Sequence, residues 1–132
     1  MTLGSADLVA FVAATDLGRA RQFYEHVLGL DVVDDSPFAC VFDDARGTTL
    51  RVTKVDAVPA ATYTVLGWET ADITAVMRDL ATRGVIFERF PGMTQDDLGI
   101  WDTPTGDRVA WFKDPDGNTL SLTQTATPSA TG

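Results

Sequence analysis

The stretch Gly47-Thr-Thr-Leu-Arg-Val-Thr53 returns seventy positions later (117 − 47) as Gly117-Asn-Thr-Leu-Ser-Leu-Thr123. Four of the seven residues are identical, and a fifth position is apolar in both copies. A match at a fixed offset indicates a duplicated structural unit. Arg51 and Ser121 fall at the same central point of the two copies, so they are the first positions to compare.

A second recurrence supports the duplication. The apolar stretch Leu8–Ala14 is followed by Asp16, an amphipathic segment and Gly29, and the same order recurs around Asp72 and Gly84. Aspartate is typical of a helix N-cap, and glycine commonly follows the last helical turn. We therefore expect each half of the chain to begin with a strand and a helix.

Alternating apolar residues and turn signals predict the remaining strands. The expected strands are Leu8–Ala14, Leu30–Val33, Phe38–Phe42 and Thr48–Val55 in the first half, and Thr64–Thr70, Val85–Arg89, Arg108–Lys113 and Thr119–Thr123 in the second. This order is β-α-β-β-β twice, which predicts an α+β fold with modules at residues 1–58 and 62–125. The small, polar tail 126–132 is predicted to be disordered.

The composition excludes several classes of function. Ten Lys and Arg against nineteen Asp and Glu give a net charge of −9 and a pI near 4.3. This argues against nucleic-acid binding and is compatible with a cationic ligand. The single Cys40 excludes an intrachain disulfide and favours a cytoplasmic location. We predict neither a signal peptide nor a membrane partner, since Leu8–Ala14 lacks a preceding basic residue and is too short to span a bilayer.

Two stretches resemble the vicinal oxygen chelate superfamily, which includes glyoxalase I, bleomycin-resistance proteins and extradiol dioxygenases. Trp111-Phe-Lys-Asp-Pro-Asp-Gly-Asn-Thr-Leu-Ser-Leu122 is similar to its closing signature, and the segment Asp16–Leu30 resembles its first helix and following turn. The resemblance implies two βαβββ modules whose curved mixed sheets form a cup for a small molecule. It does not imply one reaction, because one fold hosts many chemistries. Together with the exposed strand edges of short modules, it predicts a homodimer.

The resemblance also identifies four positions at which metal-dependent members carry His, Glu or Gln. They lie on the first and last strand of each module, and here they are Val9, Arg51, Val65 and Ser121. Transition metals need imidazole, thiolate or carboxylate donors. The sequence therefore predicts no metal and no other cofactor.

Other candidate groups have simpler structural explanations. His26 is expected at the exposed C-terminal end of the first helix, where a positive charge is favourable. Cys40 is interpreted as a buried apolar residue rather than a nucleophile. The neighbours Asp96 and Asp97 point to opposite faces of an extended chain, and the acids of the Asp114–Asn118 segment suit a turn.

Alternation assigns the side chains that would line the cup. Every second residue of each expected strand faces inward, and Cys40 is placed on the same inward face as Phe38 and Phe42. Leu8 and Trp68 are expected on the opposite face, against the helices. Arg51 requires an acidic partner if it is buried, which could be Glu69, the ligand or a second subunit. The predicted ligand-binding residues are Val9, Phe11, Phe38, Phe42, Arg51, Val65, Glu69, Val109, Trp111 and Ser121.

Such a lining predicts a metal-free protein that binds a small aromatic or cationic molecule, with sequestration of an antibiotic or metabolite as one use. One alternative is a metal-independent or unusual-metal lyase or isomerase that uses Arg51 and Glu69. A second alternative is a structural or regulatory dimer whose own side chains fill the cup. Turnover of a bound ligand distinguishes the first two hypotheses, and the volume of the empty cup distinguishes the third.

Overall fold

The computed structural model describes residues 2–44 and 46–126. The chain divides into two compact units, Met1–Ala60 with Asp114–Asn118 and Ala61–Lys113 with Thr119–Gly132. A short turn from the end of the chain thus packs within the first unit. The predicted disordered tail, apart from Ala126, lies outside the described residues.

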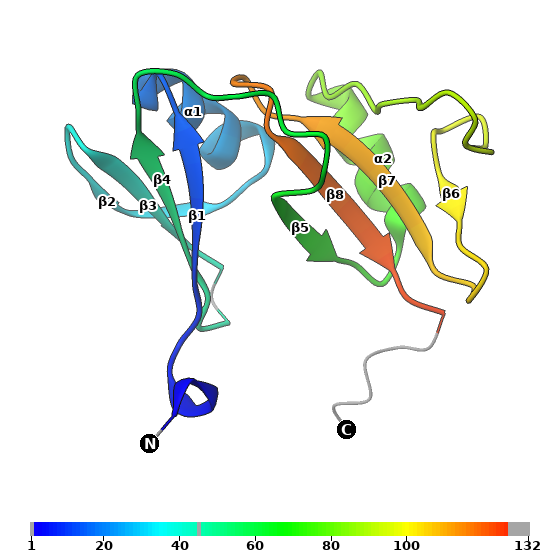
Figure 1. The fold of residues 1–132 in the computed structure, drawn as a ribbon, viewed down its shortest axis with the longest axis horizontal. Helices are drawn as coiled ribbons and strands as arrows, with labels where there is room; N and C mark the ends of the chain where they lie inside the picture. The colour runs from blue at the N-terminus through cyan, green and yellow to red at the C-terminus, as the bar shows by residue number, and fades with distance from the viewer. Residues whose placement is uncertain (1, 45, 127–132) are drawn as a thin grey trace. The chain divides into compact units, whose positions relative to one another are not determined.

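The first unit contains one four-stranded sheet and one helical segment (Figure 1). A short 3-10 turn, η1 (Leu3–Ser5), precedes the sheet. Strand β1 pairs with β4 in parallel, and the other pairs are antiparallel, in the order β1-β4-β3-β2. The elements are β1 (Val9–Ala14), α1 (Leu17–Arg21), the π-helical turn η2 (Gln22–Val27), β2 (Asp31–Asp35), β3 (Ala39–Asp43) and β4 (Thr49–Lys54).

The second unit repeats this arrangement. Its sheet has the order β5-β8-β7-β6, again with the first and last strands parallel and adjacent. The α+β class and the two βαβββ modules predicted from the sequence are therefore confirmed, with mixed sheets that do not close. The cup itself stays a prediction. The elements are β5 (Leu66–Glu69), α2 (Ile73–Thr82), β6 (Trp101–Asp102), β7 (Arg108–Lys113) and β8 (Thr119–Gln124).

Both helices begin as predicted. The Asp16 carboxylate accepts the backbone N–H of Arg19 at 3.1 Å, and the Asp72 carboxylate accepts that of Ala75 at 3.1 Å. These bonds satisfy N–H groups that have no partner inside the helix. The first helix differs from the expectation after Arg21, where it widens into η2. A π-helix encloses one more residue in each hydrogen-bonded turn than an α-helix does, and the spacing of apolar residues in the sequence does not predict this change.

The duplication extends to the turn before the last strand of each module. The Asp44 side chain accepts the N–H groups of residues 46 and 48, and the Asp114 side chain accepts those of residues 116 and 118. Each turn then passes through a glycine with positive φ, 90° at Gly47 and 83° at Gly117. Left-handed backbone of this kind favours glycine because it has no Cβ.

The predicted strand Val85–Arg89 is wrong. Only an isolated bridge joins Phe87 to Phe112, and the third pairing strand of this module is β6. The Gln95 side chain takes the place of a neighbouring strand, because it accepts the N–H of Phe90 and donates to the carbonyl of Glu88. A side chain that occupies these backbone groups leaves no continuous ladder for a strand.

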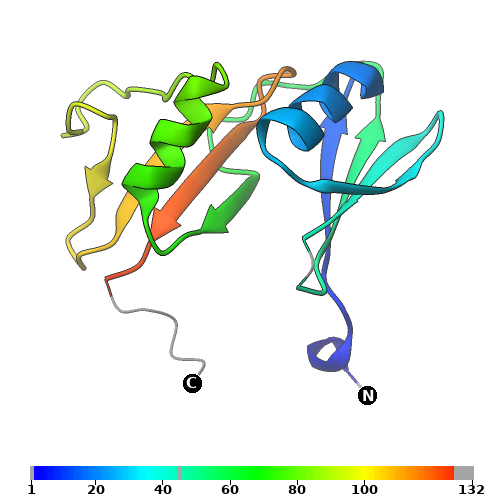
Figure 2. The ribbon, with the colours of Figure 1, turned by 180° about the vertical axis from the view of Figure 1, so that it is seen from behind.

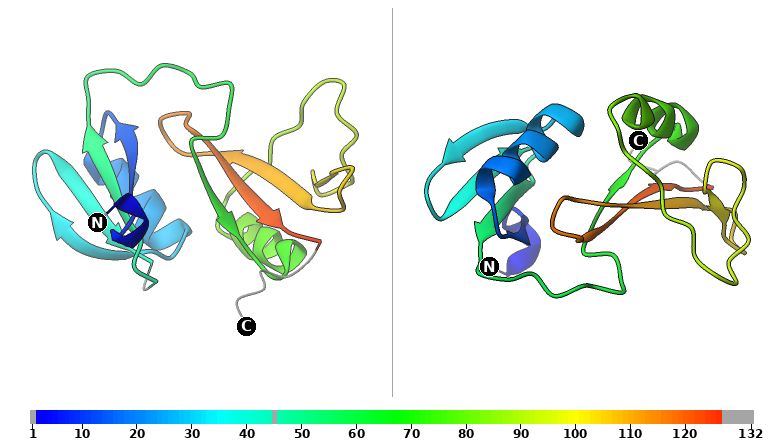
Figure 3. Two further views of the ribbon diagram at one scale, coloured as in Figure 1. Left: turned by 60° about the horizontal axis from the view of Figure 1, so that its bottom comes forward. Right: turned by 90° about the horizontal axis from the view of Figure 1, so that it is seen from above.

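Each helix covers one face of its own sheet (Figures 2 and 3). Alternate strand residues on the covered face form the core, as their period of two requires. Leu8 was predicted to join them, but it precedes β1 and is exposed. The buried apolar residues include Val12, Tyr24, Phe42 and Val52 in the first unit and Ile73, Met77, Ala110, Phe112, Leu120 and Leu122 in the second. In the described part of the chain, no helix is long and apolar enough to cross a membrane.

We predict that Gly117→Ala lowers the free energy of unfolding by about 1–2 kcal/mol, because an alanine at this positive φ strains the backbone. Gly18→Ala is the control, since Gly18 lies in α1 without a positive φ. Alanine there should leave stability unchanged or raise it by up to about 1 kcal/mol. Urea denaturation of both variants measures the difference, and equal effects would contradict the turn assignment.

Candidate functional site

The uncovered face of the second sheet is defined by its strand register. Trp111 lies opposite Ser121, and Ser121 lies beside Gly67 on the parallel strand. Residues paired in this way carry their side chains on the same face of a sheet. The partners of Ser121 on the strands that flank it therefore face away from α2 with it, as the sequence predicted for Trp111 and Ser121.

The next row of the same face runs from Glu69 through Thr123 and Val109 to Trp101. Val65 continues the face, because its N–H bonds the carbonyl of Thr119 at 2.9 Å. The predicted inward positions Val65, Glu69 and Val109 thus share one face. Trp101 was not predicted, although its indole belongs to the same row.

An aromatic array covers part of this face. The rings of Trp101 and Trp111 stack at a centroid distance of 6.2 Å and an interplanar angle of 29°. Phe90 meets Trp111 edge-on, with a centroid distance of 5.4 Å. The Trp111 indole nitrogen donates to the Thr64 hydroxyl at 3.0 Å, which fixes the orientation of the ring. Phe90, Trp101 and Trp111 together form a preformed aromatic surface, called here the aromatic array.

The loop that supplies Phe90 is held by its own polar groups. The Asp96 carboxylate accepts three backbone N–H groups, those of residues 98, 99 and 100, at 2.9–3.0 Å. The Arg89 guanidinium donates to the carbonyls of Asp96 and Asp97 at 2.7 and 2.8 Å. Asp96 therefore stabilises the loop rather than acting as half of an acid–base pair with Asp97.

The opposite side of the face is small and polar. Ser121 is only 8% exposed, and Gly67 beside it has no side chain. Glu69 is exposed, and its carboxylate accepts the Thr125 hydroxyl at 2.9 Å. The face thus combines a broad apolar surface on β6 and β7 with small polar groups on β5 and β8.

The first sheet has its own uncovered face. Phe11 lies beside Arg51, and Val9 lies beside Thr49, on the parallel pair β1 and β4. Phe11 is 64% exposed, and Arg51 is exposed without an ion pair to any residue in 2–44 or 46–126. The register thus places Val9, Phe11 and Arg51 on one face, and none of the three is taken up by the core of its unit. Their contact with a ligand stays a prediction.

The face predicted for Phe42 and Cys40 is wrong. Phe42 pairs with Leu50 and Cys40 with Val52, so both point toward the helix, and the rings of Phe42 and Tyr24 lie 5.8 Å apart. The register of β3 on β4, which the sequence pattern alone left open, reverses the expected parity. Burial raises the pKa of the Cys40 thiol, which disfavours the reactive thiolate. Phe38 precedes β3 and is 78% exposed.

The residues at the implied metal positions do not fit a transition metal. Val9 and Val65 offer no donor atom, Ser121 offers a hydroxyl, and Arg51 offers a cation. Across residues 2–44 and 46–126, no group of three or more His, Cys, Asp and Glu side chains could hold a metal ion. His26 lies at the end of η2 beside Glu25, exposed as expected.

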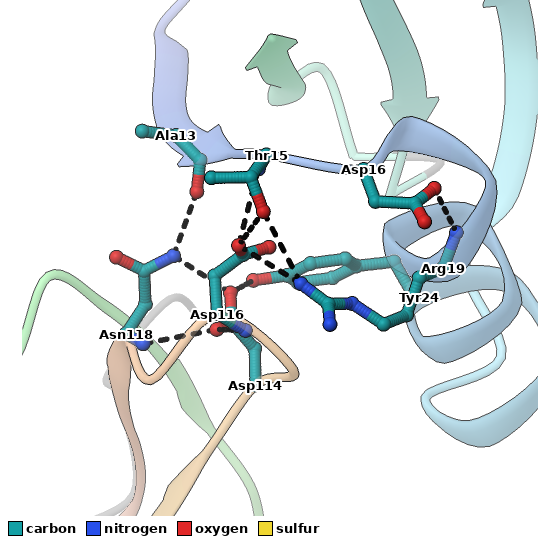
Figure 4. A network of polar contacts seen from close by, with 8 residues as sticks. All are labelled: Ala13, Thr15, Asp16, Arg19, Tyr24, Asp114, Asp116 and Asn118. Carbon is teal, nitrogen blue, oxygen red and sulfur yellow. Dashed lines mark hydrogen bonds and ion pairs between the residues drawn. The ribbon is translucent and has the colours of Figure 1, made fainter. Parts of the chain in front are cut away.

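A second candidate is a buried polar cluster in the first unit (Figure 4). The Tyr24 hydroxyl donates to Asp114 Oδ2 at 2.7 Å, and the Asn118 amide donates to the same oxygen at 2.8 Å. The Asn118 amide also donates to the carbonyl of Ala13 at 2.9 Å. Asp114 is thus a buried carboxylate whose charge is balanced by hydrogen bonds rather than by a cation.

Asp116 completes this cluster from the same turn. Its Oδ1 accepts the Thr15 hydroxyl at 2.7 Å, the Thr15 N–H at 3.1 Å and the Arg19 guanidinium at 3.1 Å. Its Oδ2 is buried without a hydrogen-bond partner among the described residues. Arg19, whose side chain is half-exposed, supplies the positive charge among these partners of the carboxylate.

The cluster is structural rather than catalytic. Burial, and then the charge of Asp114, raise the pKa of the Tyr24 hydroxyl far above its ordinary value. Tyr24 therefore keeps its proton and serves as a donor to Asp114. The sequence predicts the Asp114–Asn118 turn but not its buried partner Tyr24, which lies 90 residues away in the chain.

A protein-family model described as the Glyoxalase/Bleomycin resistance protein/Dioxygenase superfamily matches residues 6–122. The chain therefore belongs to this superfamily, and the resemblance seen in its sequence is confirmed. No curated protein matches the chain.

Solved structures share the fold along nearly the whole chain. An antibiotic binding protein from Streptomyces sp. CB03234 is 26% identical with a TM-score of 0.70, covering 92% of this chain and 97% of that one. A superfamily member from Sphaerobacter thermophilus DSM 20745 is 27% identical with a TM-score of 0.69, covering 91% and 97%. A lactoylglutathione lyase from Agrobacterium tumefaciens, 19% identical with a TM-score of 0.70 and covering 91% and 93%, shares the fold alone.

We predict that Tyr24→Phe lowers the free energy of unfolding by about 1–3 kcal/mol, because the buried Asp114 carboxylate loses a donor. Tyr63→Phe is the matched control, since Tyr63 is exposed and should tolerate the same change. Chemical denaturation near neutral pH measures both. A Tyr24→Phe variant as stable as the control would show that the cluster does not support the first unit.

Proposed function

We propose that this chain is a metal-free protein that binds a flat aromatic small molecule against the uncovered face of its second sheet. The observation that carries the proposal is the aromatic array of Phe90, Trp101 and Trp111, held in place without a helix covering it. Oriented indole rings on an uncovered face offer a stacking surface that a ligand can use without reorganising the protein.

The chemistry of the face suits orientation as well as stacking. Small-molecule sites are mostly apolar and carry a few polar groups that fix the pose of the ligand. Here Ser121 and Glu69 supply those groups on the side away from Trp101. We propose the face of Val9, Phe11 and Arg51 on the first sheet as a further ligand-contacting surface, with Arg51 binding an acidic or carbonyl group.

The comparisons support a binding role over a particular reaction. The antibiotic binding protein with 26% identity matches 92% of this chain, so sequestration of an antibiotic or related metabolite is the use that we propose. The net charge of −9 favours neutral or cationic compounds over anionic ones. The homodimer and the cytoplasmic location stay predictions from the sequence.

We predict that Trp111→Ala weakens ligand binding by about 2 kcal/mol or more, because it removes the centre of the stacking surface. Trp68→Phe should lower stability with little effect on affinity, since Trp68 stacks on Phe112 on the helix side at 6.4 Å. A thermal-shift screen of flat aromatic compounds identifies a ligand, and fluorescence titration measures its affinity for each variant. If Trp111→Ala binds normally and Trp68→Phe does not, the ligand does not bind on the uncovered face, and the proposed site is wrong.

We predict that the purified protein carries no stoichiometric Zn, Fe, Ni or Mn. The physical reason is the donor set at the four implied positions, which lacks imidazole, thiolate and carboxylate groups. Elemental analysis after gel filtration measures the metal content. One equivalent of any of these metals per chain that survives mild chelation would contradict the proposal.

A further inference from the structure

The Ser121 hydroxyl is available to an outside partner. Ser121 is 8% exposed, and no residue in 2–44 or 46–126 forms a hydrogen bond with its side chain, yet its oxygen is not fully enclosed and still reaches solvent. A hydroxyl in this state can donate to a ligand or accept from one. The Thr119 hydroxyl on the same strand differs, because it donates to the Ala61 carbonyl at 3.1 Å.

The neighbouring Gly67 leaves room for this hydroxyl. A Cβ built on Gly67 would lie 2.6 Å from Ser121 Oγ, well inside a permissible contact. Glycine weakens a strand because it loses more backbone entropy and packs no side chain. Its presence in β5 is therefore accounted for by the close approach of Ser121, whose hydroxyl extends over Gly67 on the uncovered face.

The pair lies in the same row as the centre of the aromatic array. Ser121 is flanked by Trp111 on β7 and by Gly67 on β5. A ring stacked on Trp111 would place its edge toward Ser121, because neighbouring strands in a sheet are only about 5 Å apart. The nearest carboxylate in the register, Glu69, belongs to the next row and already accepts the Thr125 hydroxyl.

We propose that Ser121 and Gly67 form a subsite for a neutral oxygen substituent at the edge of the aromatic ligand. This proposal rests on the proposed function and narrows its ligand to hydroxy- or keto-substituted flat aromatic compounds. A serine hydroxyl both donates and accepts, so it serves either substituent. Gly67 determines specificity, because any side chain there would push the hydroxyl out of this position.

The test uses two probes of nearly equal shape, 2-naphthol and 2-methylnaphthalene, which differ by a hydroxyl in place of a methyl group. Their affinities for the full chain are measured by quenching of tryptophan fluorescence, and the ratio between them is the readout. A single neutral hydrogen bond corresponds to a preference of about fivefold. We expect Ser121→Ala to lower the ratio by about that factor while leaving 2-methylnaphthalene binding unchanged.

Two further variants separate the hydroxyl from the shape of the site. Gly67→Ala should lower the ratio as Ser121→Ala does, because the new methyl group displaces the hydroxyl. In the double variant, Gly67→Ala should have no further effect on the ratio. Ser36→Ala is the matched control, since it removes a serine hydroxyl from the turn before β3. Circular dichroism checks that each variant is folded.

The outcomes distinguish failure of the subsite from failure of the proposed ligand-binding function on which it rests. If both probes bind and Ser121→Ala leaves their ratio unchanged, the subsite is overturned and the aromatic site stands. If neither probe binds the wild-type chain, the proposed function fails and the subsite fails with it. A lowered ratio in Ser121→Ala and Gly67→Ala, but not in Ser36→Ala, supports the subsite.

Discussion

The hydrogen bond from Tyr24 to Asp114, 2.7 Å long and fully buried, is the constraint on which the rest of the structure depends. It holds the turn Asp114–Asn118 within the first unit, although the strands on either side of that turn belong to the second. Those strands, β7 and β8, carry Trp111 and Ser121. The polar cluster therefore fixes the conformation of the turn that joins β7 to β8.

The two modules share a backbone framework but differ in the side-chain contacts built on it. The Asp44 turn repeats the hydrogen bonds of the Asp114 turn, but Asp44 is exposed and Asp114 is buried. At the offset of seventy, Val41 occupies the position of Trp111. The aromatic residue at the centre of the array therefore has an aliphatic counterpart in the first module, whereas the buried polar cluster belongs to the first unit.

The sequence repeat also indicates the correct face for Phe42, whose predicted face was wrong. Phe42 matches Phe112 at the same offset, and both point toward the helix of their module. At the same offset, Trp111 matches Val41, so the repeat assigns Val41 rather than Phe42 to the uncovered face. Alternation shows that neighbouring residues of a strand lie on opposite faces, but not which of the two faces meets the helix. That assignment requires the pairing of the strand with its neighbour, or a matching strand in a repeat.

The sequence alone determined the order of strands and helices apart from β6, the Asp16 and Asp72 caps, and the alternating faces of five strands, because caps and periodicity depend on neighbouring residues. Only the tertiary structure decided that Trp101 and Phe90 join Trp111, and that Tyr24 reaches Asp114 across ninety residues. These contacts depend on how distant segments pack, and a local pattern carries no record of that packing. The fold could therefore be predicted from the chain, whereas the aromatic array and the buried cluster could not.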